Sequence, residues 1–137
     1  MKVSGYDATQ RAVIEEDAGA DAIHAEISGG TSGPATLQRA LGDRVSYRVR
    51  EVPLTSGEAR GYARAEMLRR SRSFVTATGA TPGVADLIVG STLNLRNVGA
   101  PFEGAGYYVT RMSHTYDITV GFRTRFEAER PWIGALR

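Results

Sequence analysis

The sequence contains no cysteine, and Lys2 is its only lysine. Without cysteine the chain cannot form disulfides, thiolate metal sites or a cysteine nucleophile. It has no apolar run long enough to span a membrane, and residues 1–5 lack the apolar stretch of a signal peptide. We therefore expect no membrane partner and no signal peptide.

Net charge is also scarce, because 17 basic and 15 acidic residues leave only +2 over 137 residues. The isoelectric point of about 9.2 points towards nucleic acid, but an excess of this size is mild. Nearly all the basic residues are arginines, which form bidentate pairs with carboxylates. Nucleic acid is therefore not the expected partner.

The sequence contains enough apolar residues to form a hydrophobic core. The length and the 42% of hydrophobic residues predict one compact domain. Strand-like residues begin almost at residue 2, so we interpret residues 1–137 as a single barrel-like domain taken from a longer protein.

Alternating apolar and polar residues predict most of the strands. Phe122, Thr124 and Phe126 alternate with charged residues, and a tight connection at Asp117 and Ile118 predicts a hairpin. The strands are expected at residues 2–7, 11–14, 44–52, 74–78, 92–95, 107–116 and 119–129. Curling into a barrel would remove their exposed edges.

Helical patterns are fewer. Thr55 and Glu58 have the spacing of a capping box, which predicts one main helix over about residues 56–71. A short helix is expected over 34–41, and the acidic, glycine-rich stretch 15–35 predicts a long flexible loop. The sequence thus predicts an α+β fold: a mostly antiparallel, β-barrel-like domain with one main helix.

His114 is the obvious candidate for catalysis, with Ser113 beside it and Asp117 three residues further on. Adjacent residues of a strand point to opposite faces, so Ser113 and His114 cannot form a dyad directly. We interpret His114 as a strand histidine held by a hydrogen bond. A small hydrolase built on His114 and Asp117 is the alternative.

Metal and phosphate sites have weak candidates. Asp17, Asp21 and Glu26 do not have the spacing of a calcium loop, and His24 has no close partner ligand. Residues 29–33 resemble a phosphate-binding loop only faintly, because the lysine of a P-loop is missing. We expect a solvated acidic loop, a flexible linker, and no metal, cofactor or catalytic site.

Two further groups of residues bear on partners. A small basic cluster near the end of the main helix is expected to be solvated or to form salt bridges; it consists of Arg64, Arg69, Arg70 and Arg72. A set of aromatic residues is expected to fill the barrel; it consists of Phe74, Phe102, Tyr107, Tyr108, Phe122 and Phe126. Trp132 is expected to cap one end of the barrel or to meet a further domain. A nucleic-acid-binding barrel module remains a second alternative, and it predicts affinity that falls steeply with salt.

The order of several short motifs carries a family resemblance. A Phe-x-Gly motif precedes a Tyr-x-Val-Thr strand that contains a histidine, and a Gly-aromatic-x-Thr hairpin follows. The residues are Phe102, Gly104, Tyr107, Val109, Thr110, His114, Gly121, Phe122 and Thr124. Upstream, residues 3–7 and the helix residues Glu58, Ala59 and Ala63 fit the same pattern. The chain resembles the late-control-D tail-hub family of contractile phages, whose relatives include the trimeric valine-glycine repeat spikes of type VI secretion.

The resemblance implies a structural protein and not an enzyme. Hubs of this family are trimeric, and their paired barrels form a pseudo-sixfold ring that joins the sixfold tail tube to the threefold spike. The implied partners are a second and third copy of the chain, the tail tube protein and the spike. Assembly is expected in the bacterial cytoplasm, with the product in a virion tail or injection apparatus. The arginine- and glutamate-rich strands at 44–52 and 119–129 are the expected edges for pairing between subunits.

Overall fold

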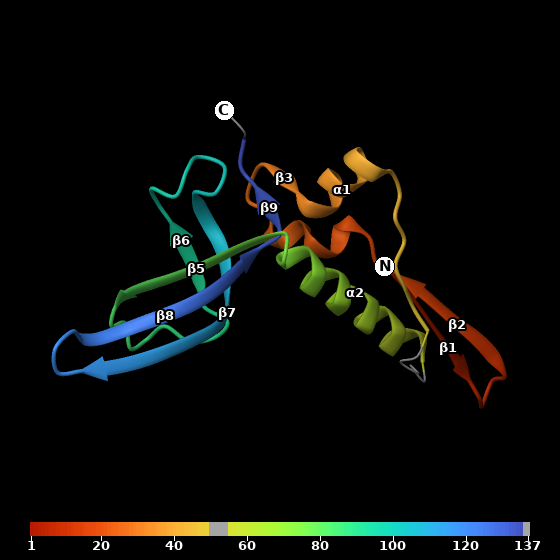
Figure 1. The fold of residues 1–137 in the computed structure, drawn as a ribbon. Coiled ribbons are helices and arrows are strands. Elements are labelled where there is room, and N and C mark those ends of the chain that lie inside the picture. Colours follow the sequence, from red (N-terminus) through yellow and green to blue (C-terminus); the bar gives the residue numbers. More distant parts are fainter. Residues whose placement is uncertain (50–54, 136–137) are drawn as a thin grey trace. The chain divides into compact units, whose positions relative to one another are not determined.

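The computed structural model describes residues 1–49 and 55–135, and the fold is α+β with mostly antiparallel strands. The chain divides into two compact units: residues 1–25 with 32–71, and residues 26–31 with those from 72 onward. Figure 1 labels most of the helices and strands of both units. The prediction of one hub domain over residues 1–137 stays a prediction.

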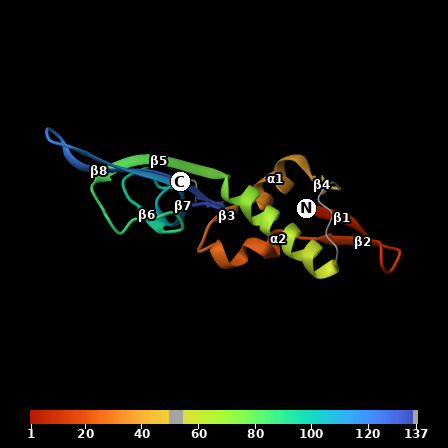
Figure 2. The same cartoon turned by 90° about the horizontal axis from the view of Figure 1, so that it is seen from below.

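The first unit contains a three-stranded sheet in the order β2-β1-β4 (Figure 2). Strands β1 (Lys2–Asp7) and β2 (Ala12–Asp17) confirm the strands predicted at residues 2–7 and 11–14, and they pair as an antiparallel hairpin. Its turn is held by the Asp7 carboxylate, which accepts the Thr9 and Gln10 amides at 2.8 and 2.9 Å. Strand β4 (Tyr47–Arg48) pairs with β1 in parallel.

The strand predicted over residues 44–52 is much shorter in the structure. Only Tyr47 and Arg48 pair with β1, and residues 44–46 have no regular structure. Residues 50–52 lie outside the described residues. Alternation alone could not show this, because the length of a strand depends on how much of a neighbour it can pair with.

Helix α2 (Ser56–Arg72) begins directly after Thr55, the first residue of the predicted capping box. The Thr55 amide donates to the Glu58 carboxylate at 3.0 Å, and the Glu58 amide donates to the Thr55 hydroxyl at 3.2 Å. Ala59 and Ala63 lie one turn apart and are fully buried against Val3. No helix in the described part of the chain is both long and apolar enough to cross a membrane.

The expectation of a long flexible loop over 15–35 is wrong for most of that stretch. Strand β2 continues to Asp17, and a 3-10 helix, η1 (Ala20–Glu26), follows with Ile23 fully buried. A short strand, β3 (Thr31–Ser32), precedes helix α1 (Gly33–Leu41). The Ser32 side chain caps α1 by accepting the Ala35 amide at 3.3 Å, so this helix is present as predicted.

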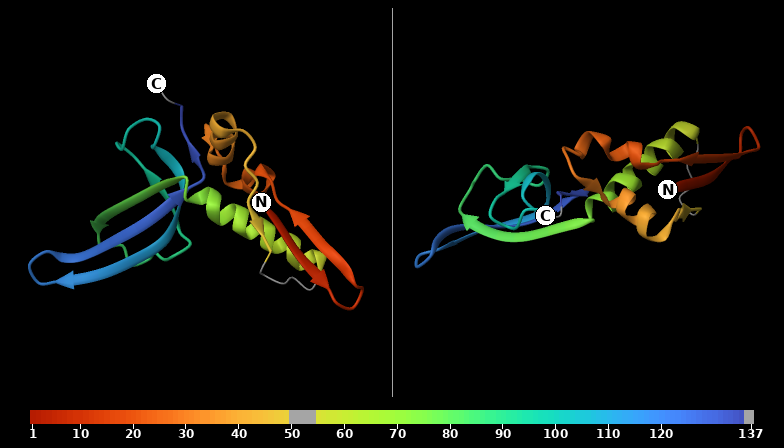
Figure 3. Two further views of the ribbon diagram at one scale, coloured as in Figure 1. Left: turned by 45° about the vertical axis from the view of Figure 1, so that its right-hand side comes forward. Right: turned by 90° about the horizontal axis from the view of Figure 1, so that it is seen from above.

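The second unit is built on a four-stranded antiparallel sheet in the order β5-β8-β7-β6 (Figure 1). Its strands are β5 (Val75–Pro82), β6 (Thr92–Leu95), β7 (Gly104–Asp117) and β8 (Gly121–Arg130). The β7–β8 hairpin confirms the predicted one, and its tip extends beyond the end of β5 (Figure 3). Strand β9 (Trp132–Ile133) pairs with β3. The four-stranded sheet is a curled half-barrel, and within the described chain it keeps two edges, β5 and β6.

Strand β5 runs four residues past its predicted end at residue 78. The added residues pair with β8 from Gly79 to Pro82. A β-carbon at Gly79 would lie 2.6 Å from the Phe126 ring, and one at Gly83 would lie 1.9 Å from the Phe122 ring. Glycines that read as loop signals therefore make room for aromatic rings on the neighbouring strand.

Candidate functional site

His114 lies on β7 directly opposite Thr124 of β8. Its Nδ1 atom is 2.9 Å from the Thr124 hydroxyl, and its ring centroid is 5.4 Å from that of Phe122. The Thr124 hydroxyl, which is fully buried, also accepts the Val84 amide at 3.0 Å. The histidine thus makes a cross-strand hydrogen bond, as the sequence predicts, in a network that ties the loop after β5 to the hairpin.

The Asp117 carboxylate holds the hairpin turn, whereas a hydrolase would need it to act together with His114. The carboxylate accepts the amides of Thr119 and Val120 at 2.7 and 3.2 Å. These backbone hydrogen bonds lower the pKa of Asp117 below its usual value. The carboxylate therefore closes the hairpin turn, while His114 bonds to Thr124, so the two residues are not paired as acid and base.

The acidic residues that were considered as an unlikely calcium site lie at the end of one element and at opposite ends of the next. Asp17 ends β2, Asp21 lies in the first turn of η1, and Glu26 ends η1 and binds Arg72. No group of three or more histidines, aspartates and glutamates in the described residues could hold a metal ion. His24 is exposed on η1.

The glycine-rich stretch 29–33 is partly a structural contact. Gly30 has a φ of 71°, and a β-carbon there would lie 2.0 Å from the Ile133 carbonyl oxygen. The backbone therefore passes too close to β9 for any side chain. Close packing of two backbones, and not a phosphate, explains this glycine.

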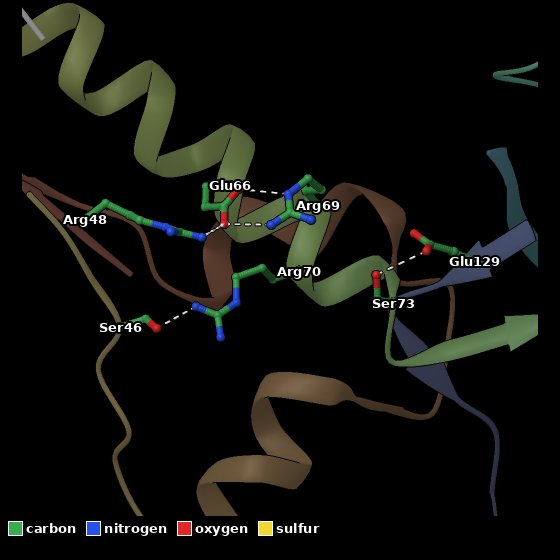
Figure 4. A network of polar contacts seen from close by, with 7 residues as sticks. All are labelled: Ser46, Arg48, Glu66, Arg69, Arg70, Ser73 and Glu129. Atoms are coloured by element: carbon green, nitrogen blue, oxygen red, sulfur yellow. Dashed lines mark hydrogen bonds and ion pairs between the residues drawn. The ribbon is translucent and has the colours of Figure 1, made fainter. Parts of the chain in front are cut away.

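The arginines of the basic cluster are largely engaged by neighbours, as Figure 4 shows for Arg69 and Arg70. Arg69 makes two hydrogen bonds of 2.8 Å to the Glu66 carboxylate, and Arg48 adds one of 3.0 Å. These bonds, that of Arg69 first, lower the pKa of Glu66 from 4.5 to about 2 despite its burial, which raises it. Arg70 donates to the Ser46 hydroxyl, whereas Arg64 is exposed.

Arg72 is held on two sides in the second unit. It forms a bidentate ion pair with Glu26, and its guanidinium lies 3.9 Å from the centre of the Tyr108 ring. In the same unit Ser73 donates to Glu129 at 3.1 Å (Figure 4). A guanidinium stacked on an aromatic ring and paired with a carboxylate is not available for phosphate contacts.

The aromatic residues fill the core less than expected. Tyr107 is buried, and Phe126 packs against the core of the second unit. Phe74, Phe102 and Phe122 are each more than a third exposed, so the expectation that all six fill a barrel is wrong for these. The sheet is open, and it therefore has no closed interior to receive them.

A buried arginine that no local sequence pattern indicates organises one end of the second unit. Arg130 is fully buried and donates to the carbonyls of Pro101, Glu103 and Trp132, each at 2.9 Å. Its guanidinium lies 4.4 Å from the centre of the Tyr107 ring and 4.0 Å from that of Trp132. Burial lowers the pKa of Arg130, and the carbonyls and ring faces compensate the buried charge.

Strand β8 is not a sheet edge, although the sequence suggested it as one. It pairs with β5 on one side and with β7 on the other. The long edge of this sheet is instead β5, whose register with β8 runs over all eight of its residues. No other described strand pairs with β5.

Neither a comparison of the sequence with protein-family models nor one with curated proteins finds a match. The function therefore has to be inferred from the geometry and from the resemblance in the motifs.

Proposed function

We propose that this chain is a structural domain of a tail hub, the part of a contractile phage tail or related injection machine that joins the tail tube to the spike. The barrel-like character, the trimeric state and the partners that the resemblance implies all belong to this proposal. The tail tube protein and the spike are the expected partners, and the chain carries out no turnover.

The observation that supports this proposal best is the structural role of the motif residues. Tyr107 and Val109 are core residues, and His114 bonds across the hairpin to Thr124. Gly121 has a φ of 75° and lies opposite Asp117 at the end of the hairpin. The residues that carry the resemblance thus build the hairpin and its core, which is what a structural family selects for.

Nucleic-acid binding is the second candidate, and the ion pairs of Arg69, Arg72 and Arg111 argue against it. Glu66 and Glu26 neutralise arginines of α2, and the Glu127 carboxylate pairs with Arg111 at 3.3 Å. A nucleic-acid surface needs cations free to contact phosphates. A binding assay with single-stranded DNA at two salt concentrations distinguishes a nucleic-acid-binding module from a structural hub domain, since phosphate binding weakens steeply with salt.

The experiment that tests this proposal asks whether the chain is present in assembled tail-like particles, and in how many copies. Tail-like particles purified from the producing bacterium are analysed by quantitative mass spectrometry, with the tail tube protein as the internal standard. We expect the chain in every particle, at half the copy number of one sixfold tube ring. Particles that assemble completely without this chain would reject the hub function.

The His114→Ala variant addresses the hydrolase alternative. A structural role predicts lower stability of the hairpin and unchanged, absent turnover of generic ester and peptide substrates. Measurable turnover in the unchanged protein that the substitution abolishes while the fold persists would support the hydrolase instead.

A further inference from the structure

Strand β8 carries a row of charges whose sign reverses at the middle of the strand. Two arginines precede Phe126 and two glutamates follow it, all at alternate positions: Arg123, Arg125, Glu127 and Glu129. Alternate residues of a strand share one face of the sheet, so the four charges form a single row. Phe126, where the sign reverses, lies opposite Gly79 of β5. A half-turn about Gly79 therefore places arginines where glutamates were, and the row is complementary to a second copy of itself.

Strand β5, which lies between this row and the edge of the sheet, presents unpaired backbone groups. The Gly83 amide donates to the Phe122 carbonyl at 2.8 Å, so the backbone at Gly83 faces β8. Because backbone orientation alternates along an antiparallel strand, the backbone groups of the even-numbered residues point away from β8. These residues are Thr76, Thr78, Ala80 and Pro82, and all four are exposed.

The β5 edge has little of the usual protection against pairing. Exposed edge strands are commonly blunted by charged residues, by proline, by bulges or by being short. Strand β2, the long edge in the first unit, carries Glu15, Glu16 and Asp17, and β6 spans only four residues. Strand β5 spans eight residues without a charge, its register with β8 is unbroken, and its proline, Pro82, is the last residue.

We propose that two copies of this chain pair along β5, antiparallel about a twofold axis at Gly79, so that their sheets form one continuous sheet. Thr78 then lies opposite the partner's Ala80, and Thr76 lies opposite the partner's Pro82. Thr78 and the partner's Ala80 exchange both backbone hydrogen bonds, whereas the partner's Pro82 only accepts one. A twofold contact of this kind uses the same surface on both copies.

The charges of β8 match along the whole of this contact. Thr78 lies opposite Glu127 and Ala80 lies opposite Arg125, so Glu127 comes into line with the partner's Arg125. The outer glutamate and the outer arginine match in the same way. The aligned strands are three spacings or about 14 Å apart, and only small residues of β5 lie between them, so the long side chains can extend towards each other. Since Glu127 also pairs with Arg111, the charges select the register more than they strengthen the contact.

The apolar face of the sheet supports the same axis. The Phe126 ring lies over Gly79, because a β-carbon at Gly79 would be 2.6 Å from that ring. Gly79 and the partner's Gly79 form a non-hydrogen-bonded pair, in which α-carbons are about 4.5 Å apart. The two Phe126 rings, each only partly buried in its own copy, therefore meet across the axis at a separation typical of aromatic pairs.

The neighbouring registers lose the charge match. An axis at Thr78 or at Ala80 opposes fewer outward-facing residues, and it places like charges of β8 in line at its centre. An axis at Ala77 aligns glutamates with glutamates, and one at Thr81 aligns arginines with arginines. Of these registers, the one centred on Gly79 alone opposes all the outward-facing residues and aligns only opposite charges.

This pairing goes beyond the proposed hub function and does not depend on it. The threefold contacts of a hub would have to use other surfaces, because a twofold contact along β5 cannot close a trimer. The two ideas can therefore fail separately, and the mass of the assembly in solution distinguishes them.

The first test is the solution mass of the chain, measured by light scattering across a range of concentrations. We expect monomers to pass to dimers as concentration rises. Thr78→Pro removes the outward amide that bonds to the partner's Ala80 without removing a bond to β8. This variant should stay monomeric and keep its melting temperature within a few degrees.

The second test reports the register and uses the absence of cysteine from the chain. Opposite residues of a hydrogen-bonded antiparallel pair have α-carbons about 5.5 Å apart, which suits a disulfide. A mixture of Thr78→Cys and Ala80→Cys chains should therefore cross-link, with the two thiols oxidised to a disulfide and oxidised glutathione reduced to glutathione. Either variant by itself is the matched control, since its two cysteines would be diagonal neighbours about 7–8 Å apart and should cross-link much more slowly.

The third test exchanges the charges. Arg125→Glu and Glu127→Arg each place like charges in line across the axis, so each variant should dimerise severalfold more weakly at low salt. In an equal mixture of the two variants every aligned pair is opposite in sign. The mixture should therefore form heterodimers at concentrations at which each variant by itself is monomeric.

Three outcomes would overturn the proposal. The first is a chain that stays monomeric at every concentration and whose cysteine variants give no disulfide when mixed. The second is a dimer or trimer that Thr78→Pro leaves intact, and a trimer of that kind would leave the hub function standing. The third is cross-linking of Thr78→Cys or Ala80→Cys by itself as fast as that of the mixture, which would show another register or random collision.

Discussion

We expect that replacing Arg130 destabilises the second unit much more than replacing an exposed charged residue of the same strand does. Arg130→Met keeps most of the length and the apolar stem of the side chain while removing the guanidinium. The change withdraws the donor from the carbonyls of Pro101, Glu103 and Trp132.

The cost can be worked out contact by contact. Pro101 keeps one hydrogen bond, because its carbonyl also accepts the Gly134 amide at 2.8 Å. The carbonyls of Glu103 and Trp132 lose the guanidinium, at roughly 1–3 kcal/mol each. The two cation–π contacts add about 1 kcal/mol each, and relief from burying a charge offsets part of the sum. We expect a net loss of about 3 kcal/mol in the free energy of unfolding.

Trp132 makes the measurement direct, because it is the only tryptophan of the chain and stacks on Arg130. Urea unfolding is followed by its fluorescence maximum, which moves to longer wavelength when the ring meets water. Arg123→Met is the matched control, since Arg123 is exposed on the same strand, and it should change stability by less than about 0.5 kcal/mol.

The reasoning would fail if Arg130→Met unfolded within about 1 kcal/mol of the unchanged chain. That result would mean that the free-energy cost of burying the Arg130 charge equals the stabilisation from its hydrogen bonds and cation–π contacts. Arg130→Lys should not rescue the loss, because one ammonium cannot reach three separated carbonyls while stacking on two rings.

Three further perturbations test other parts of the fold. The pKa of Glu66 is lowered from 4.5 to about 2, so the stabilisation from its ion pairs is complete above about pH 4.5 and is lost as the pH falls towards 2. Because Arg69 is largely exposed, we expect this loss to be about 1–2 kcal/mol in the free energy of unfolding. Melting of the helix followed by circular dichroism should show this pH dependence, and Glu66→Gln should abolish it. Gly83→Ala should cost about 2 kcal/mol in thermal unfolding, since its β-carbon would overlap the Phe122 ring, and Phe122→Ala in the same chain should recover part of that loss. Thr55→Ala removes the cap of α2 and should lower the free energy of unfolding by about 1 kcal/mol, whereas Thr55→Ser should not.

Features encoded by neighbouring residues could be predicted from the sequence. The capping box at Thr55 fixed the start of α2, and the period-two pattern with a turn at Asp117 predicted the β7–β8 hairpin. The hydrogen bond of His114 within its strand pair was also anticipated, because a lone histidine on a strand has few other uses.

Features that depend on distant residues could not be predicted. Gly79 and Gly83 read as loop signals, and only their positions against Phe126 and Phe122 explain them. The free edge of β5 follows from β8 lying between β5 and β7, which no local pattern encodes. Arg130 looked like another charged residue of an alternating strand, because its burial depends on Tyr107 and on the carbonyls of Pro101 and Glu103, which lie more than 20 residues away in the sequence.

The short segment around Gly30 has a consequence for the order in which the protein can fold. Residues 26–31 belong to the second unit, although they interrupt the chain of the first. As the protein is synthesised, Gly30 emerges about a hundred residues before Ile133, the residue it packs against, so a ribosome adding roughly 5–20 residues per second exposes this segment for several seconds or longer. During that interval the first unit can already form its sheet and helices, while the second waits for its last strand. Synthesis speed, and not only sequence, then influences how much of the chain reaches the native pairing of β3 with β9.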